Sequence, residues 1–182
     1  MDHTESILHL KKILHPDFVK KIIPLIEKKA TENLTIENMI VDKTIRNVKG
    51  FTLNFKTPTN LFYWNFIKSE IHRLYLFYKG KFPKMQSKKL AQIDLLKYTS
   101  GGKYDVHVDN YTDSTRHLSV IFNLNDKYEG GDLIFTDQKD QEVKRLKLDA
   151  GDAVFFPSNF MYPHGITPII EGTRYSIVAW LR

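Results

Sequence analysis

One histidine and one aspartate, placed two residues apart, could bind the same metal ion. They are His107 and Asp109, in the sequence YDVHVD of residues 104–109. Alternate residues of a β-strand point to the same face, so both side chains would share a face with their Cα atoms about 6–7 Å apart. A second histidine, His164, opens a later apolar run in the sequence PHG. Two histidines and one carboxylate predict a site of the kind that holds Fe(II) with open coordination positions.

An arginine ten residues after His164 could bind an anion beside this metal. If residues 173–181 form a strand, Arg174 shares a face with Val178 and Trp180. Such a setting is unusual for arginine, because a buried guanidinium is costly unless an anion pairs with it. Guanidinium and carboxylate match through two parallel hydrogen bonds. The missing carboxylate could belong to a dicarboxylic co-substrate whose other end chelates the metal.

The composition excludes several other chemistries. The 182 residues include no cysteine, which excludes thiolate zinc sites, iron–sulfur clusters, disulfide scaffolds and cysteine nucleophiles. The chain has no Gly-x-Ser-x-Gly elbow and no phosphate-binding loop ending in Lys-Ser or Lys-Thr. Any metal must therefore be held by histidine and carboxylate side chains.

Charge and hydropathy indicate an ordinary globular protein. Lys and Arg number 27 against 21 Asp and Glu, for a net charge of +6, and hydrophobic residues make up 42%. The basic residues are mostly lysines scattered through amphipathic segments, so a solvated surface is favoured over nucleic-acid binding. No apolar run approaches the ~20 residues of a membrane span, and the acidic N-terminus is unlike a secretory signal. We expect a cytoplasmic protein with no membrane partner.

The apolar pattern predicts an α+β fold, with helices in the first half and strands in the second. Helical spacing predicts helices at 17–29 and 60–78, and Pro24 should bend or divide the first. The predicted apolar stripe of the second helix consists of Leu61, Trp64, Ile67, Ile71, Leu74 and Tyr75.

Short apolar runs separated by turn residues follow these helices, as in an antiparallel sandwich or barrel. The predicted strands are 93–98, 104–109, 117–124, 132–136, 143–148, 153–157, 164–170 and 173–181. Eight strands fit two packed sheets of four, with the helices outside. We therefore expect a single domain over residues 1–182, in which 1–90 is mainly helical support and 91–182 is the β core.

Several motifs together resemble the Fe(II)- and 2-oxoglutarate-dependent oxygenases, and within them the prolyl 4-hydroxylase-like family. Residues 96–110 (LKYTSGGKYDVHVDN) look like its Tyr-x-x-Gly-x-x-Tyr-x-x-His-x-Asp signature. The later sequences GGDL and GDAVFF resemble its Gly-Gly strand opening and its Gly-x-x-x-x-Phe strand, and His164 with Arg174 resembles its His-x9-basic ending. The resemblance covers residues 93–182 well. It implies a double-stranded β-helix, a jelly roll of about eight antiparallel strands, with the N-terminal helices packed on one sheet.

The resemblance implies a role for each matching residue. His107, Asp109 and His164 would be catalytic as the iron ligands, and Arg174 would bind the distal carboxylate of 2-oxoglutarate. Relatives carry either lysine or arginine at that last position.

Other positions match the family less closely. Tyr98 matches a tyrosine that lines the co-substrate pocket. Asn123 stands where some relatives have a tyrosine that reaches the same distal carboxylate, so its role stays open. The residues expected on the substrate side are Trp180, Tyr104 and Asn110. The expected lids are residues 110–116, directly after the ligand strand, and the segment 47–60.

The resemblance also implies the reaction. With Fe(II) and O2, 2-oxoglutarate would be decarboxylated to succinate and CO2 while the substrate is hydroxylated, and ascorbate is expected as a further requirement. The favoured partner is a protein or peptide that contains the proline to be hydroxylated. A nucleobase or a free amino acid as the substrate, and a cupin-like metal-binding protein that is not an oxygenase, are the alternatives. Arg174 argues against the cupin-like alternative, because such a protein has no reason to hold a cation beside the metal.

Overall fold

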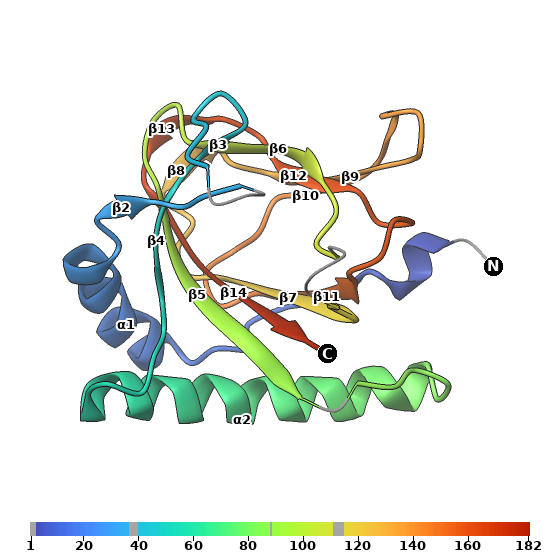
Figure 1. The fold of residues 1–182 in the computed structure, drawn as a ribbon, viewed down its shortest axis with the longest axis horizontal. Coiled ribbons are helices and arrows are strands. Elements are labelled where there is room, and N and C mark those ends of the chain that lie inside the picture. Colours follow the sequence, from blue (N-terminus) through green and yellow to red (C-terminus); the bar gives the residue numbers. More distant parts are fainter. Residues whose placement is uncertain (1–2, 37–39, 88, 111–114) are drawn as a thin grey trace.

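Two antiparallel sheets face each other in this protein, with one long helix beneath one of them and a shorter helix at its side (Figure 1). The structure is a computed structural model that describes residues 3–36, 40–87, 89–110 and 115–182. The helices are η1 (His3–Ser6), α1 (Pro16–Lys29) and α2 (Pro58–Lys81). The strands are β1 (Leu8–Leu10), β2 (Glu32–Asn33), β3 (Arg46–Asn47), β4 (Lys49–Thr52), β5 (Leu90–Tyr98), β6 (Lys103–His107), β7 (Leu118–Asn123), β8 (Tyr128–Gly130), β9 (Leu133–Thr136), β10 (Glu142–Leu146), β11 (Ala153–Pro157), β12 (His164–Ile166), β13 (Ile169–Gly172) and β14 (Arg174–Leu181).

The predicted jelly roll is confirmed and is larger than predicted. The seven-stranded sheet has the order β1-β11-β7-β14-β5-β4-β2, and the five-stranded sheet has the order β10-β9-β12-β6-β3. Each sheet contains four of the predicted strands. Short strands from the N-terminal half extend both sheets, and β8 and β13 form a separate pair.

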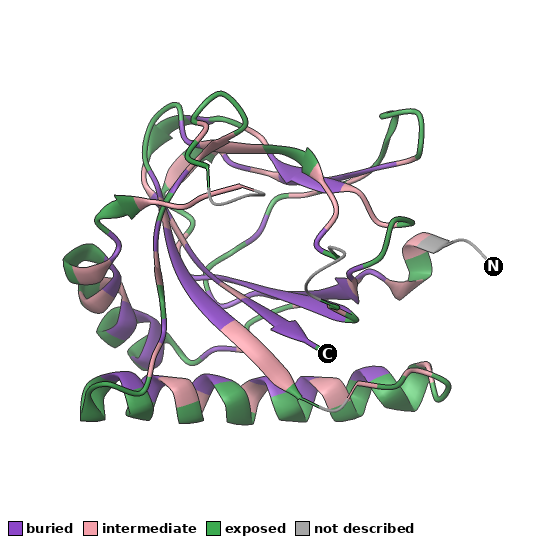
Figure 2. Cartoon of the chain, viewed as in Figure 1, coloured by how far each residue is buried: buried purple, intermediate pink, exposed green. Residues whose placement is uncertain are grey.

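The seven-stranded sheet is buried on both faces. Its outer face packs against α1 and α2, so that Ile22 and Ile67 share a hydrophobic cluster with Ile177 of β14. Its inner face packs against the five-stranded sheet through a second cluster, which includes Ile121 and Phe135. Figure 2 shows the burial concentrated in these central strands and on the helix faces turned toward them. This two-sided burial explains the nearly continuous apolar run of β7, because neither face of the strand meets water.

Helix α2 is longer than predicted, and its predicted stripe is turned inward except at Leu61, with Ile67, Ile71 and Leu74 buried and Trp64 and Tyr75 partly buried against the core. Its N-cap is Thr57, whose side chain accepts a hydrogen bond from the backbone N–H of Asn60. Tyr63 is buried, whereas Leu61 is 43% exposed, because two residues correspond to about 200° of rotation around a helix. Neither α2 nor any other helix of the described residues combines the length and the apolar character that a bilayer crossing requires.

Two prolines lie within predicted elements. Helix α1 continues through Pro24 and is not divided there. The carbonyl that loses its hydrogen bond belongs to Lys20, which is exposed, so water can satisfy it. The predicted strand 164–170 is in fact two strands, because Pro168 interrupts it and cannot donate to a ladder. As a result β12 pairs with β6 and β9, whereas β13 pairs with β8.

Glu27 joins α1 to two neighbouring strands of the seven-stranded sheet. Its carboxylate accepts hydrogen bonds from Lys97 of β5, at 2.5 Å, and from the hydroxyl of Tyr175 of β14. These two hydrogen bonds lower the pKa of Glu27 from 4.5. The stabilisation is therefore complete above about pH 4.5 and is lost as the pH falls through the lowered pKa.

We expect Glu27→Gln to lower the free energy of unfolding by up to about 1 kcal/mol at pH 7, since the pair is partly exposed. The difference from the unaltered protein should vanish at a pH below the lowered pKa, where Glu27 is protonated. Urea denaturation at several pH values measures this, with Glu171→Gln on an exposed strand as the control. A loss that is equally large at every pH would contradict the prediction.

Candidate metal and co-substrate site

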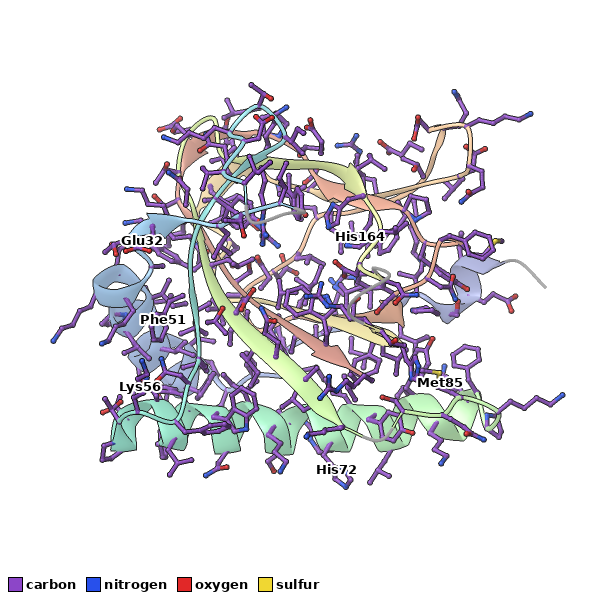
Figure 3. All side chains as sticks on the ribbon, viewed as in Figure 1. Glu32, Phe51, Lys56, His72, Met85 and His164 are labelled. Atoms are coloured by element: carbon purple, nitrogen blue, oxygen red, sulfur yellow. The ribbon has the colours of Figure 1, made fainter. Side chains whose placement is uncertain are left out.

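Three side chains of the five-stranded sheet and its adjoining loop bring their ligand atoms together. His107 ends β6, Asp109 follows two residues later, and His164 opens β12, where it pairs with His107 across the ladder. One ligand atom of each residue lies within 4.8 Å of the others. Asp109 Oδ1 is 3.5 Å from His107 Nε2, and Asp109 Oδ2 is 3.4 Å from His164 Nε2. In Figure 3 His164 lies between the two sheets.

Backbone carbonyls orient both imidazoles toward this point. His107 Nδ1 lies 2.8 Å from the carbonyl oxygen of Asp105, and His164 Nδ1 lies 3.1 Å from that of Tyr162. If each Nδ1 donates its proton there, each Nε2 presents a lone pair to the carboxylate of Asp109. Three electron-pair donors that face one another are stabilised by a cation between them, and such backbone hydrogen bonds are typical of metal-binding histidines. The donor set fits Fe(II).

The electrostatics of these residues favour the metal-binding protonation state. Burial lowers the pKa of His107, and the neighbouring His164 lowers it further. Burial alone would raise the pKa of Asp109, but the neighbouring imidazoles of His164 and His107, when they are protonated, hold it well below its usual value. A neutral imidazole and an ionised carboxylate are the forms that bind metal.

A buried hydroxyl of the opposite sheet, in contact with a second buried hydroxyl, holds the carboxylate of Asp109. Ser119 of β7 donates from Oγ to Asp109 Oδ2 at 2.6 Å. The hydroxyl oxygens of Ser119 and Ser158, which follows β11, are 2.8 Å apart. Both serines are almost completely buried. Asp109 is thus oriented from the seven-stranded sheet while the two histidines come from the five-stranded sheet.

We expect Ser119→Ala to weaken metal binding by about 10- to 100-fold, because it removes the hydrogen bond that orients a ligand. Titration of the metal-free protein with Co(II), followed by absorbance, measures the change. Ser100→Ala, at an exposed position, is the matched control. Unchanged Co(II) affinity in Ser119→Ala, with an unchanged melting temperature, would contradict this role.

Arg174 is a buried cation without a carboxylate partner among the described residues. Only 1% of it is exposed. Its Nη1 donates to Ser176 Oγ at 3.2 Å, whereas Nε and Nη2 have no hydrogen-bond partner. The guanidinium lies 5.4 Å from the ring centroid of Tyr98, its partner across the β14–β5 ladder. Because an unpaired buried charge is costly, these unused donors indicate a position for an anion.

The second glycine of the GGDL motif leaves room for this arginine. Gly131 has a φ of +66°, and a Cβ atom there would lie 2.4 Å from Ile169 Cδ1 and 3.1 Å from Arg174 Cδ. Only glycine meets both requirements without strain.

One pocket connects the three ligands to Arg174. It lies between the two sheets, and its empty space of about 410 Å3 includes open solvent at its mouth. Its lining consists of Arg46, Leu96, Tyr98, Tyr104, His107, Asp109, Ile121, His164, Ile166, Arg174, Val178 and Trp180. The structure thus brings the predicted metal and co-substrate residues into one cavity.

The residues predicted on the substrate side are only partly in this cavity. Tyr104 and Trp180 line it. The ring of Tyr104 stacks on His107, with centroids 3.6 Å apart, and Trp180 Nε1 is buried without a hydrogen-bond partner. Asn110 is exposed and outside the lining, and its Oδ1 accepts the backbone N–H of Arg116 at 3.0 Å.

Asn123 is used within the fold and lies outside the pocket lining. Its amide donates to the carbonyl oxygens of Asn125 and Leu148, at 2.6 and 2.9 Å, and its Oδ1 accepts the hydroxyl of Tyr128. Asn123 therefore has no free amide donor for the distal carboxylate of 2-oxoglutarate, which a tyrosine reaches in some relatives.

The two segments predicted as lids are 110–116 and 47–60. Residues 111–114 of the segment 110–116 lie outside the described residues. The segment 47–60 contains β4, which pairs with β5, and the first turn of α2. That segment is therefore part of the scaffold.

Sequence reasoning did not find Arg46, Ser119 or Ser158. Arg46 comes from a two-residue strand far along the chain from the histidines. Serine in an apolar strand carries no signal of its own, so the contact of Ser119 with Asp109 is visible only in the folded protein.

A family model described as the 2OG-Fe(II) oxygenase superfamily matches residues 93–182. This chain belongs to that superfamily. The family implies Fe(II), 2-oxoglutarate and O2, and the group of His107, Asp109 and His164 fits iron. The predicted family is therefore confirmed.

Relatives and solved structures agree with this family membership. A PKHD-type hydroxylase of Maricaulis maris is 30% identical over 120 residues, which cover 64% of this chain and 53% of the relative. The chain spans about half or less of the first three curated relatives, between 40 and 53% of their length.

Solved structures share the fold of this protein. A Trichoplax adhaerens prolyl hydroxylase, solved in complex with a hypoxia inducible factor peptide fragment, has a TM-score of 0.82 at 18% identity. The match covers 98% of this chain and 84% of the Trichoplax chain. A Pseudomonas putida prolyl-4-hydroxylase has a TM-score of 0.76 at 19% identity, over 97 and 92%. These structures share the double-stranded β-helix fold with this superfamily member.

Proposed function

We propose that this protein is an Fe(II)- and 2-oxoglutarate-dependent hydroxylase that acts on proline in a peptide or protein. One observation carries the proposal: the convergent His107, Asp109 and His164 share a pocket with the buried, unpartnered guanidinium of Arg174. A cation beside a metal site suits a dicarboxylic co-substrate. The PKHD-type hydroxylase relatives support the hydroxylase activity, and the peptide bound to the Trichoplax enzyme supports a peptide substrate.

Each side chain of the site would have a defined task. His107, Asp109 and His164 would hold the iron, which when bound supplies the activation of O2 coupled to 2-oxoglutarate decarboxylation. Arg174 would bind the distal carboxylate through Nε and Nη2, and so direct the keto-acid end toward the metal. Tyr98 would form a wall of this co-substrate position. The apolar side chains of the lining would exclude water from the reacting atoms.

We also infer that residues 1–182 act as one oxygenase domain. The hydrophobic cluster that α1 and α2 share with β7 and β14 supports this inference, because the strands that carry Arg174 and Ser119 depend on the helices for their outer packing.

Incubation of the protein with Fe(II), 2-oxoglutarate, ascorbate and proline-containing peptides tests the proposal. We expect succinate to form and one oxygen atom to be added to proline, as detected by mass spectrometry. Omission of ascorbate should reduce sustained turnover. If the iron-loaded protein consumes no 2-oxoglutarate, the proposal fails. Oxygen addition to a free amino acid or a nucleobase, with proline peptides unmodified, would refute the proposed substrate.

A further inference from the structure

The pocket that contains Arg174 has a second arginine in its lining, Arg46. Arg46 comes from β3 at the edge of the five-stranded sheet, whereas Arg174 comes from β14 of the seven-stranded sheet. Two guanidinium groups therefore reach one pocket from opposite sides. Both also act on the buried hydroxyl of Tyr98, since burial raises its pKa and the charges of Arg174 and Arg46 lower it.

The guanidinium of Arg46 is held close to the metal site. Its Nη1 donates to the carbonyl oxygen of Thr35 at 2.6 Å. Its Cζ lies 4.6 Å from the ring centroid of Tyr104, and that ring stacks on His107. Arg46, Tyr104 and His107 thus form a continuous stack from the guanidinium to a proposed metal ligand. The guanidinium of Arg46 is therefore separated from a proposed metal ligand by one aromatic ring, in the lining of the same pocket.

One donor of this guanidinium is buried and unused. Arg46 Nε has no hydrogen-bond partner, and no ion pair in the described part of the chain involves Arg46. The one acidic residue of the pocket lining is Asp109, whose oxygens face the histidines and Ser119. If 2-oxoglutarate occupies Arg174, Arg46 is the cation left for a second anion.

We propose that Arg46 binds a carboxylate of the substrate that is hydroxylated. This inference rests on the proposed function and deepens it, because it specifies the substrate as a proline with an acidic group close by. The carboxylate could be the α-carboxylate of a C-terminal proline, or the side chain of an aspartate or glutamate adjacent to the proline. Both present the planar pair of oxygens that a guanidinium recognises.

Matched peptides test this recognition. The first set has blocked ends and one internal proline, with Ala, Glu or Lys beside it. The second set ends in proline, either as the free acid or as the amide. Binding is measured by calorimetry to the Mn(II)-loaded protein with 2-oxoglutarate, and oxygen addition is measured by mass spectrometry with Fe(II).

We expect at least one carboxylate probe to bind ~10-fold or more tightly than its neutral counterpart, as for a charge-assisted hydrogen bond. Arg46→Gln should remove this preference, while the exposed control Lys49→Gln, with the same loss of charge, should keep it. The preferred set then identifies the source of the carboxylate. Melting temperatures verify that both variants are folded.

Three outcomes would overturn the inference. The first is equal binding of neutral and acidic probes, and the second is a preference for the carboxylate that persists in Arg46→Gln. The third is an Arg46→Gln variant that needs more 2-oxoglutarate for half-maximal succinate formation but keeps its peptide preference, which would assign Arg46 to the co-substrate. Failure of the proposed function differs from all three, because then no probe leads to consumption of 2-oxoglutarate by the iron-loaded, unaltered protein.

Discussion

Asp109→Ala is expected to reduce iron-dependent turnover of 2-oxoglutarate by at least ~1000-fold, because the site loses its only anionic ligand and with it the bound metal. His107→Ala should have an effect of the same order. The fold should persist. Burial of the charged Asp109 is unfavourable, and only the neighbouring side chains of the site compensate for it, so its removal should not unfold the protein. Succinate formation and Co(II) binding measure the loss, and the melting temperature measures the fold.

Asp126→Ala is the matched control for this prediction, because Asp126 is an exposed loop residue outside the pocket lining. It should retain full turnover and metal binding. Asp109→Asn keeps the shape of the side chain and removes its charge, so it separates loss of the ligand charge from a change in packing. Full activity in Asp109→Ala or in His107→Ala would exclude the proposed metal triad.

The second large effect concerns Arg174. Arg174→Ala should raise the 2-oxoglutarate concentration for half-maximal turnover by ~100-fold or more, because loss of one partner of a buried charge pair costs about 2–5 kcal/mol. Arg174→Lys should raise it much less, since an ammonium group retains the charge but not the two parallel hydrogen bonds. Equal behaviour of the two variants would exclude the assigned role.

A binding measurement without turnover distinguishes this role from a structural one. In the Mn(II)-loaded protein, 2-oxoglutarate should raise the melting temperature of the unaltered protein and of Arg174→Lys, but not of Arg174→Ala. Without 2-oxoglutarate, Arg174→Ala should be no less stable than the unaltered protein, because the guanidinium is buried without an anion. A large loss of stability there would indicate a structural role.

Local sequence patterns were sufficient for most of the central strands and for the residues predicted at the metal and co-substrate positions. The spacing of His107 and Asp109 predicted two ligands on one side of the chain, although β6 ends at His107 and Asp109 lies just beyond it. The alternation along β14 puts Arg174 on the pocket side and Ile177 on the helix side. Both inferences depend on the two-residue period of a strand, which is a property of neighbouring residues. The same holds for the GGDL motif, whose second glycine takes a positive φ.

Only the tertiary structure decided which distant residues meet at the site. Arg46 and Tyr104 are partners across a ladder, and Ser119 reaches Asp109 from the other sheet. The hydrogen bond from the Asn123 amide to the carbonyl oxygen of Leu148 likewise joins residues that are distant in the sequence. No short-range pattern encodes such contacts, because an isolated arginine, serine or asparagine is compatible with a solvated position. Strand pairing and sheet packing bring these groups together. Burial then strengthens each hydrogen bond and makes each unpartnered donor more costly.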